Sequence, residues 1–407
     1  MSQPALERTI ARIKEWFDHR ADHHAELERW LAMESGSGDK AGIDRFGREV
    51  AGAFARLGGE VKTHPHDRYG DAQSIIFPER GEFAQRPTKV VLLGHLDTVW
   101  PRGTEADWTT SKDDGWVTGP GVLDMKGGIF VALEAVRCLR ELDTATPRLE
   151  VLLTSDEEIG SPWGSELIAR RMRDAQACLV FEPALDGGAL KTTRHGVAYY
   201  ELSVRSSGGH PGHRRTGDTN AVVELATLLL KVIEAGGAHG ELHVEPTRQV
   251  VDVPVNVIPS DVSVTLDVRY TRTRELASFE QEVNALLSAT KRPDAEGTIR
   301  EVRTRRPPLE NTDGNQWLTD LVLRAADLLG QRVEGGVTAG ASDAGYVAER
   351  EIPVVDGLGP WGTGIHAVGE AVPVEALTLR GELVAASLVL VSLELAHIPD
   401  PRVTWAV

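Results

Sequence analysis

Several carboxylate and imidazole side chains follow directly after short apolar runs in the first half of the sequence. The runs VVLL and EVLLT lead into GHLD and SDEE, the run ACLVF leads into EP, and a further acid lies in the glycine-rich segment GPGVLDMKGG. Short apolar runs of this kind are typical of buried strands, so these side chains are expected at strand ends or turns. They are His95, Asp97, Asp124, Glu157, Glu158 and Glu182.

Each of these residues has a structural interpretation when it is considered alone. His95 and Asp97 could cap a loop and the next turn, Asp124 could be the N-cap of the helix that follows it, and the acidic run could be a solvated loop. Crowded like charges are nevertheless unfavourable unless a cation or a proton compensates them. The coincidence of these acids at one edge of a sheet therefore favours a metal site.

A second imidazole occurs late in the chain. His366 lies in the glycine-rich stretch WGTGIH, and the chain has only two cysteines, Cys138 and Cys178. Two histidines and several carboxylates without thiolates form an oxygen and nitrogen ligand set that suits zinc, with cobalt or manganese as alternatives.

The elements that would position these residues alternate between short β-rich runs and longer helical patterns from residue 88 onward. This order predicts an α/β domain with a mixed, mainly parallel sheet and helices on both faces, and such sheets bind ligands at the carboxyl ends of their strands. Longer alternating strands and two helices then indicate a smaller α+β, ferredoxin-like insertion. We expect residues 1–194 and 307–407 to form the catalytic domain and residues 195–306 to form the insertion.

Composition limits the partners and the compartment. Lys and Arg number 44 against 61 Asp and Glu, which gives a net charge of −17 and disfavours nucleic acid as a partner. The charged N-terminal segment is expected to be an amphipathic helix without a secretory signal, and 377–396 a helix facing the core rather than a membrane span. Together with the few cysteines, these features predict a cytoplasmic protein.

The motifs GHLDTV, GPGVLDMKGG, TSDEEIGS and FEP resemble those of one metallopeptidase family, in the same order and at the same spacing. The family includes glutamate carboxypeptidase, acetylornithine deacetylase, succinyl-diaminopimelate desuccinylase and the aminoacylases. The resemblance covers about residues 88 to 370 and is strongest to the glutamate carboxypeptidase (carboxypeptidase G) branch. The interrupted domain plan is similar as well.

The resemblance implies a dinuclear zinc centre in which Asp124 bridges the two Zn²⁺ ions. One ion would also be held by His95 and Glu182, and the other by Glu158 and His366. Glu157 would then be the general base. Asp97 would stand behind His95 and fix its tautomer. The family also suggests a non-proline cis peptide bond between Asp124 and Met125.

The resemblance further implies substrate contacts from the inserted domain of a homodimer. His210, in SSGGHPGHRR, matches a histidine that helps to hold the developing oxyanion. Arginine binds a free carboxylate through its planar fork, and the candidates are Arg269 and Arg306, with Arg305 as an alternative to the latter. Asn256 and Gly340 complete the substrate-binding set. A surface histidine and structural ion pairs are the alternative interpretations of these positions.

The expected function is metal-dependent cleavage of an amide bond next to a free carboxylate. The substrate would be a small peptide or an N-acyl amino acid, and the released C-terminal amino acid would be Glu or Asp. Deacylation of the acetylornithine or succinyl-diaminopimelate type and dipeptidase activity are alternatives. A dinuclear phosphoesterase and a non-catalytic binding protein on the same scaffold are more remote.

Overall fold

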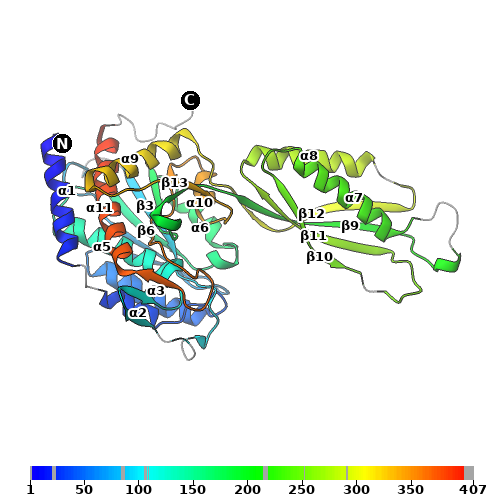
Figure 1. Ribbon diagram of the computed structural model, residues 1–407, viewed down its shortest axis with the longest axis horizontal. Helices are drawn as coiled ribbons and strands as arrows, with labels where there is room; N and C mark the ends of the chain where they lie inside the picture. The colour runs from blue at the N-terminus through cyan, green and yellow to red at the C-terminus, as the bar shows by residue number, and fades with distance from the viewer. Residues whose placement is uncertain are drawn as a thin grey trace. The chain divides into compact units, whose positions relative to one another are not determined.

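The computed structural model describes most of the chain as two compact units (Figure 1). Unit 1 comprises Met1–Thr192, Asn311–Val337 and Ser342–Val407, and unit 2 comprises Thr193–Glu310 and Thr338–Ala341. The interruption of one unit by the other therefore falls within a few residues of the expected positions 195 and 306, and a short late segment, 338–341, joins unit 2. The described residues are 2–20, 24–83, 88–104, 108, 110–213, 219–251, 253–289 and 292–397.

The main sheet of unit 1 is mixed and mainly parallel, as the sequence predicts. Its strands, in spatial order, are β1 (Glu60–His64), β2 (Ala72–Phe77), β6 (Arg148–Thr154), β3 (Lys89–His95), β7 (Ala177–Val180) and β14 (Val354–Val355). β6, β3, β7 and β14 are parallel to one another, while β2 is antiparallel to both of its neighbours. Every residue of β3 and β7 is buried, which is expected for parallel strands covered on both faces.

Two smaller sheets accompany the main one. The first consists of β15 (Ala371–Pro373), β5 (Trp116–Thr118) and β4 (Ser111–Asp113), and the second consists of β13 (Gly335–Thr338) and β8 (Leu190–Arg194).

Eight helices and four short helical turns of unit 1 lie within the described residues. The helices are α1 (Gln3–Asp18), α2 (Ala25–Leu31), α3 (Lys40–Ala55), α5 (Gly127–Glu141), α6 (Gly164–Arg171), α9 (Asp313–Leu329), α10 (Ala344–Ala348) and α11 (Val374–His397). The turns are η1 (Gly81–Phe83), η2 (Val122–Lys126), η3 (Glu157–Ile159) and η4 (Asp186–Gly188).

The N-terminal segment forms the expected amphipathic helix. In α1, Leu6, Ile10, Ile13 and Phe17 are buried at intervals of three or four residues, so they share one face that packs on the core. α1 packs against α11, which in turn packs against α5 and α9.

The α11 helix is long and apolar enough to cross a membrane, but most of it is buried within unit 1. Its packing against α1, α5 and α9 accounts for this apolar composition, because a helix that is apolar on most sides must be surrounded by other elements. The helix faces the core, as the sequence predicts.

Unit 2 is a two-layer α+β structure. Its antiparallel sheet has the order β10 (His243–Val250), β11 (Asp261–Tyr270), β9 (Gly196–Ser206) and β12 (Ala295–Arg306). α7 (Ala221–Gly237) and α8 (Thr273–Ala289) pack on this sheet, and the turn η5 (Pro211–His213) lies between β9 and α7. Burial alternates along β9 and β11, as expected for a sheet with one face on the core and one face toward solvent.

Two boundaries in unit 2 differ from those that the sequence suggests. The stretch NVIPSDVSVTLDVRYT predicts one long strand, but β11 starts at Asp261 and Asn256 lies in an exposed turn. Pro259 interrupts the segment and provides no N–H group for a strand ladder. The stretch TRRPPLEN predicts a linker, yet Arg305 and Arg306 belong to β12. This edge strand has largely exposed, charged side chains, which obscure its alternating pattern.

We predict that replacing Glu382 with Gln stabilises the protein more at pH 8 than at pH 5. Glu382 is 2% exposed in α11, and burial raises the pKa of its carboxyl group to about 7. In the unfolded chain the carboxyl group of Glu382 has a pKa of about 4.3, so the free energy of unfolding falls as the pH rises from there through 7. A neutral amide at this position does not ionise and removes that loss. Thermal unfolding of Glu382→Gln and wild type at both pH values measures the difference. The exposed Glu375→Gln is the matched control, and a stability difference for Glu382→Gln that is the same at both pH values would contradict the prediction.

Candidate metal centre

Three neighbouring parallel strands end at the same edge of the main sheet and bring the predicted ligands together. His95 is the last residue of β3 and lies opposite Thr154, the last residue of β6. The acidic run that contains Glu157 and Glu158 follows β6 directly, and Glu182 lies two residues beyond the end of β7. The sheet topology therefore places side chains that are distant in sequence at one site.

Asp124 faces both histidines. Its Oδ1 lies 3.2 Å from His95 Nε2, and its Oδ2 lies 3.3 Å from His366 Nε2. Asp124 does not cap α5, since that helix begins at Gly127 and has no side-chain cap. The peptide bond between Asp124 and Met125 is cis, as the family resemblance suggests.

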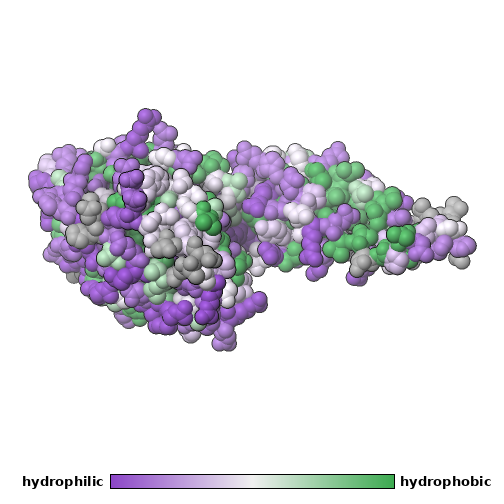
Figure 2. Space-filling view, turned by 60° about the horizontal axis from the view of Figure 1, so that its bottom comes forward, coloured by the Kyte–Doolittle hydropathy of each residue, from purple (hydrophilic) through white to green (hydrophobic). Residues whose placement is uncertain are grey.

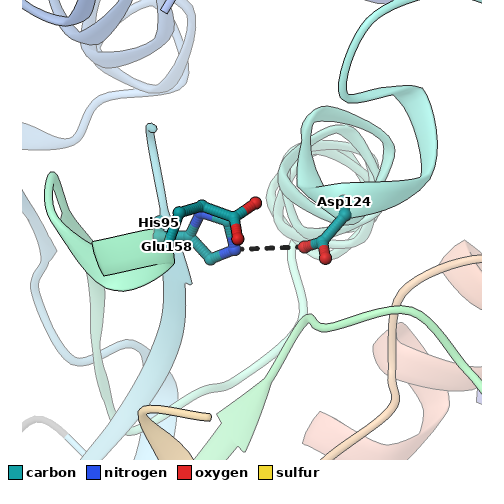
Figure 3. A group of neighbouring side chains, drawn as sticks. All are labelled: His95, Asp124 and Glu158. Carbon is teal, nitrogen blue, oxygen red and sulfur yellow. Dashed lines mark hydrogen bonds and ion pairs between the residues drawn. The ribbon is translucent and has the colours of Figure 1, made fainter. Parts of the chain in front are cut away.

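The remaining carboxylates pair with the two histidines. Glu182 Oε1 lies 3.6 Å from His95 Nε2, and Glu158 Oε2 lies 3.4 Å from His366 Nε2. Figure 3 shows His95 and Glu158 together on one side and Asp124 opposite them. Each histidine therefore has one oxygen of Asp124 and one glutamate carboxylate as neighbours.

This donor set fits two metal ions that share Asp124. Ligand atoms about 2.0–2.1 Å from a tetrahedral ion lie roughly 3.3 Å from one another, close to the separations of these side chains. Among the described residues, the buried Oε1 of Glu158 has no hydrogen-bond partner. A buried, unpartnered carboxylate oxygen is costly, and coordination to a cation would satisfy it.

His366 is presented by a tight loop and has a left-handed backbone conformation, with φ of 57°. Gly364, at φ 75°, precedes it, and the Ala367 N–H donates to the Gly364 carbonyl over 2.8 Å. The side chain of His366 is 50% exposed, whereas that of Asp124 is 8% exposed. A non-glycine residue in this conformation is uncommon and is found frequently at functional sites.

Two glycines of the GPGVLDMKGG segment allow close approach of the backbone. A Cβ atom at Gly128 would lie 2.0 Å from the Phe181 carbonyl oxygen, so only glycine lets the start of α5 pack against the segment that carries Glu182. Gly121 has φ of 75°, a conformation that strongly favours glycine.

Asp97 lies on the Nδ1 side of His95 and also makes a contact that the sequence did not indicate. His95 Nδ1 lies 2.9 Å from the main-chain carbonyl oxygen of Asp97 and 3.5 Å from its carboxylate. The carboxylate also accepts hydrogen bonds from the main-chain N–H groups of Glu157 and Glu158, both at 3.1 Å, and from Ser37 Oγ at 2.8 Å. Asp97 therefore fixes the backbone of the acidic pair, and Ser37 is a supporting residue that the sequence analysis did not identify.

The first acid of the run has a structural contact instead. Asp156 accepts hydrogen bonds from the N–H groups of Trp163 and Gly164 at the start of α6. Burial, reinforced by the nearby Asp343, raises the pKa of Asp156 to about 7. Of the acids that follow β6, the two glutamates therefore belong to the candidate centre.

The electrostatics of the cluster reflect the crowding of acids around two imidazoles. Hydrogen bonds to Asp124 and Glu158 raise the pKa of His366 to about 10. Burial acts to lower the pKa of His95, but its contacts with Asp124 and Asp97 outweigh burial and raise this pKa well above the usual value. Burial raises the pKa of Glu158. The site thus strongly favours positive charge near Asp124.

A cavity of about 630 Å³ opens beside Glu158 within unit 1. Its wall is largely apolar, with Val99 and Ile159 among the exposed hydrophobic side chains. It is lined by Gly36, Ser37, Gly38, Asp39, Thr98, Val99, Trp100, Pro101, Arg102, Glu158 and Ile159.

The five substrate-contact candidates outside the metal ligands all lie in unit 2. Arg269 on β11 forms an ion pair with Asp267 through bonds of 2.7 and 2.9 Å. The Arg306 guanidinium donates to the Ala341 carbonyl at 3.5 Å, and the Gly340 carbonyl accepts from Arg194 at 3.0 Å. His210 and Asn256 are exposed. Their roles as substrate contacts stay predictions.

Comparison with known proteins identifies the family that the four motifs suggest. The family model described as Peptidase family M20/M25/M40 matches residues 91–389, which include every candidate metal ligand.

Two curated bacterial relatives are similar over most of their length. Carboxypeptidase G2 of Pseudomonas sp. (strain RS-16) is 28% identical over 364 residues, which cover 87% of this chain and 85% of that relative. Succinyl-diaminopimelate desuccinylase of Leptothrix cholodnii is 29% identical over 374 residues, which cover 86% of this chain and 94% of the relative.

Solved structures share the fold. The aminopeptidase PepT of Bacillus cereus superimposes with a TM-score of 0.74 at 20% identity and covers 94% of this chain and 98% of its own. A dinuclear metal-binding peptidase of the M20 family from Bacillus subtilis has a TM-score of 0.68 at 14% identity, with 91% and 98% coverage. The predicted architecture is therefore confirmed.

We predict that His366→Ala weakens binding of one metal equivalent and retains the other. His366 contacts the Oδ2 side of Asp124, whereas His95 contacts the Oδ1 side, so the two positions are separable. The loss should exceed about 100-fold in affinity, the upper end for an outer-shell change at a metal site. Calorimetric titration of the metal-free protein with Zn²⁺ measures it, with the exposed His397→Ala as the control. Equal loss of both equivalents, or of neither, would be inconsistent with the assignment.

Proposed function

Because the chain belongs to the Peptidase family M20/M25/M40, we propose that it hydrolyses an amide bond next to a free carboxylate. The reaction would release a C-terminal amino acid, Glu or Asp, from a peptidyl or N-acyl conjugate. The observation that carries the proposal is the placement of Asp124 between His95 and His366, with one carboxylate oxygen toward each ring.

We propose zinc as the metal at both positions. His95, Asp124 and Glu182 would hold one ion, and His366, Asp124 and Glu158 the other. Imidazole and carboxylate ligands without thiolates suit zinc, and cobalt or manganese could replace it. When bound, the ions would polarise the amide carbonyl and lower the pKa of the attacking water.

Glu157 is the proposed general base. It is 5% exposed, and a carboxylate oxygen of Glu157 lies within 4.8 Å of ligand atoms of His95 and Glu182. The main-chain N–H of Glu157 donates a hydrogen bond to the carboxylate of Asp97, which fixes the backbone of Glu157 at the site. A carboxylate held there can take a proton from the attacking water and deliver it to the leaving nitrogen.

The acyl or peptidyl part of the substrate would occupy the cavity beside Glu158. Val99, Trp100 and Ile159 present apolar surface there, so an apolar or aromatic group is favoured over a small charged one. Arg269 and Arg306 are the proposed contacts of the free carboxylate, with Asn256 and Gly340 in supporting positions.

Deacylation is the second candidate function. The similarity to a succinyl-diaminopimelate desuccinylase over 86% of the chain favours it to nearly the same extent as the similarity to carboxypeptidase G2. Both reactions cut an amide bond beside an amino acid, so the same metal centre and the same general base serve either one.

A homodimer would use the outer face of α7. Val223, Leu230 and Ile233 are 63%, 70% and 37% exposed and recur at helical spacing, so they form one apolar stripe. Figure 2 shows apolar surface gathered on the part of the molecule that contains α7. Exposed apolar patches of this kind are typical of interaction sites. In such a dimer, His210 is the proposed oxyanion contact.

We predict that Glu157→Gln binds both metal ions but lowers kcat by about 10²–10⁴-fold, because the amide cannot accept a proton. Amine release from a panel of N-acyl and peptidyl amino acids measures the rate. Metal content by mass spectrometry separates loss of the base from loss of the ions. The exposed Glu166→Gln on α6 is the matched control. Wild-type turnover by Glu157→Gln would remove Glu157 from this role.

We also predict that Leu230→Glu converts the protein to monomers, because a charge in the centre of the α7 stripe opposes its burial. Analytical ultracentrifugation measures the change. Val302→Glu, on the strand β12 at the far edge of the sheet from β10, is the control for an exposed valine elsewhere. A wild-type protein that sediments as a monomer would contradict the dimer and the role given to His210.

A further inference from the structure

The loop that carries His366 also carries a buried glutamate. Thr363 and Ala371 close the loop through reciprocal backbone hydrogen bonds of 2.9 and 3.0 Å. His366 lies in its exposed part, and Glu370, at its base, is 1% exposed. Glu370 is not among the candidate ligands that the motifs identify, and the proposed reaction does not use it.

The carboxylate of Glu370 accepts four hydrogen bonds. Its Oε1 accepts from the main-chain N–H groups of Leu123 and Asp124, at 2.6 and 2.8 Å. Its Oε2 accepts from the main-chain N–H of Gly121 at 2.9 Å and from Trp100 Nε1 at 3.0 Å. Two carboxylate oxygens offer about four acceptor positions, so four donors satisfy the group.

All four donors are N–H groups, three of which come from one short stretch of backbone. Successive N–H groups that converge on one anion form a concave binding site for negative charge. Here the anion is a side chain of the protein itself. The segment from Gly121 to Asp124 is therefore wrapped around Glu370, and the conformation of this segment determines the direction of the Asp124 carboxylate.

Glu370 joins the Gly121–Asp124 segment to the loop that carries His366. These two segments must meet at the proposed metal position of Asp124, Glu158 and His366. The distance of 3.3 Å between Asp124 Oδ2 and His366 Nε2 connects the same two segments on the metal side. Glu370 connects them on the buried side, four residues after His366. The Glu370 side chain is therefore one of the contacts that join these two segments, beside the hydrogen bond from the Gly119 main-chain N–H to the Glu370 carbonyl and the pairing of β15 with β5.

Trp100 extends the connection to the proposed acyl cavity. Its indole lines that cavity, and its N–H is the fourth donor to Glu370. The ring of Trp108 packs against it edge to face at 4.9 Å. The same carboxylate therefore orients a wall of the cavity and the turn that carries Asp124.

We propose that Glu370 is a positioning residue for the dinuclear centre, fixing Asp124 relative to His366 through the Gly121–Asp124 backbone. This inference rests on the proposed metal-dependent function. Glu370 acts through Asp124 and does not itself touch the substrate or a metal ion.

The test is Glu370→Gln, which has the same shape but only one acceptor oxygen. Whichever way the amide is turned, its NH₂ group faces two N–H donors. Metal titration of the metal-free protein should show one of the two equivalents weakened by about 10–100-fold, the effect expected of an outer-shell partner. The absorption spectrum of the Co²⁺-substituted protein should change, and kcat should fall more than KM rises. The exposed Glu375→Gln, five residues further along, should match wild type in all three readouts.

A second variant identifies the contact involved. In Glu370→Gln the amide oxygen should take the place of Oε1, because the two hydrogen bonds to Oε1 are the shorter ones. The NH₂ group then faces the main-chain N–H of Gly121 and the indole N–H of Trp100. Adding Trp100→Phe removes one of the two opposed donors, so the double variant should recover part of the lost metal affinity. Trp100→Phe alone should leave metal affinity near that of wild type.

The outcomes separate the inference from the function on which it rests. A wild-type protein that binds no metal would refute the proposed function, and the inference would fall with it. A wild-type protein with two bound ions and a Glu370→Gln variant with unchanged affinity and spectrum would refute the inference alone, even if the variant melts at a lower temperature. If Glu370→Gln does not fold, Glu370→Asp replaces it, because aspartate keeps the charge but is too short to reach all four donors. Glu370→Asp should show the same weakening of metal affinity. Wild-type metal binding by Glu370→Asp would also refute the inference.

Discussion

Four carboxylates share the edge of one sheet with two imidazoles, and their mutual repulsion is the constraint around which this region is organised. Asp124, Glu157 and Glu182 are each less than a tenth exposed, so solvent screens their charges poorly. Buried carboxylates that lie this close to one another require a compensating cation or proton, and the ligand atoms of His95, Glu157 and Glu182 lie within 4.8 Å of one another. The raised pKa of His366, about 10, is one sign of that demand, and the buried Glu158 oxygen without a partner is another.

Specific backbone contacts hold the segments that carry these charged residues. Parallel strands deliver His95 and the acidic run to one edge, and the carboxylate of Asp97 holds the backbone of Glu157 and Glu158. Gly128 lets α5 approach the segment that carries Glu182. Glu370 binds the turn that carries Asp124. These contacts fix the backbone of the residues that present the charged groups, and the charge itself still requires a compensating cation or proton.

The parts of this arrangement that follow local patterns could be predicted from the sequence, and the parts that depend on tertiary contacts could not. Apolar runs ending in polar residues located β3, β6 and β7, and the motifs indicated the candidate ligands that the structure brings together. The contact of the Asp97 carboxylate with the Glu157 and Glu158 backbone joins segments about 60 residues apart, and no local pattern indicates it. Glu370 was missed for the same reason: its donors lie about 250 residues away, and a single glutamate after a glycine looks like an ordinary surface acid.

Anomalous X-ray diffraction from crystals grown with zinc would test the central claim most directly, because it locates each ion without reference to any substrate. The account predicts two peaks that share Asp124, one beside His95 and Glu182 and the other beside Glu158 and His366. A single peak, or ions bound away from Asp124, would contradict the dinuclear centre and the function derived from it.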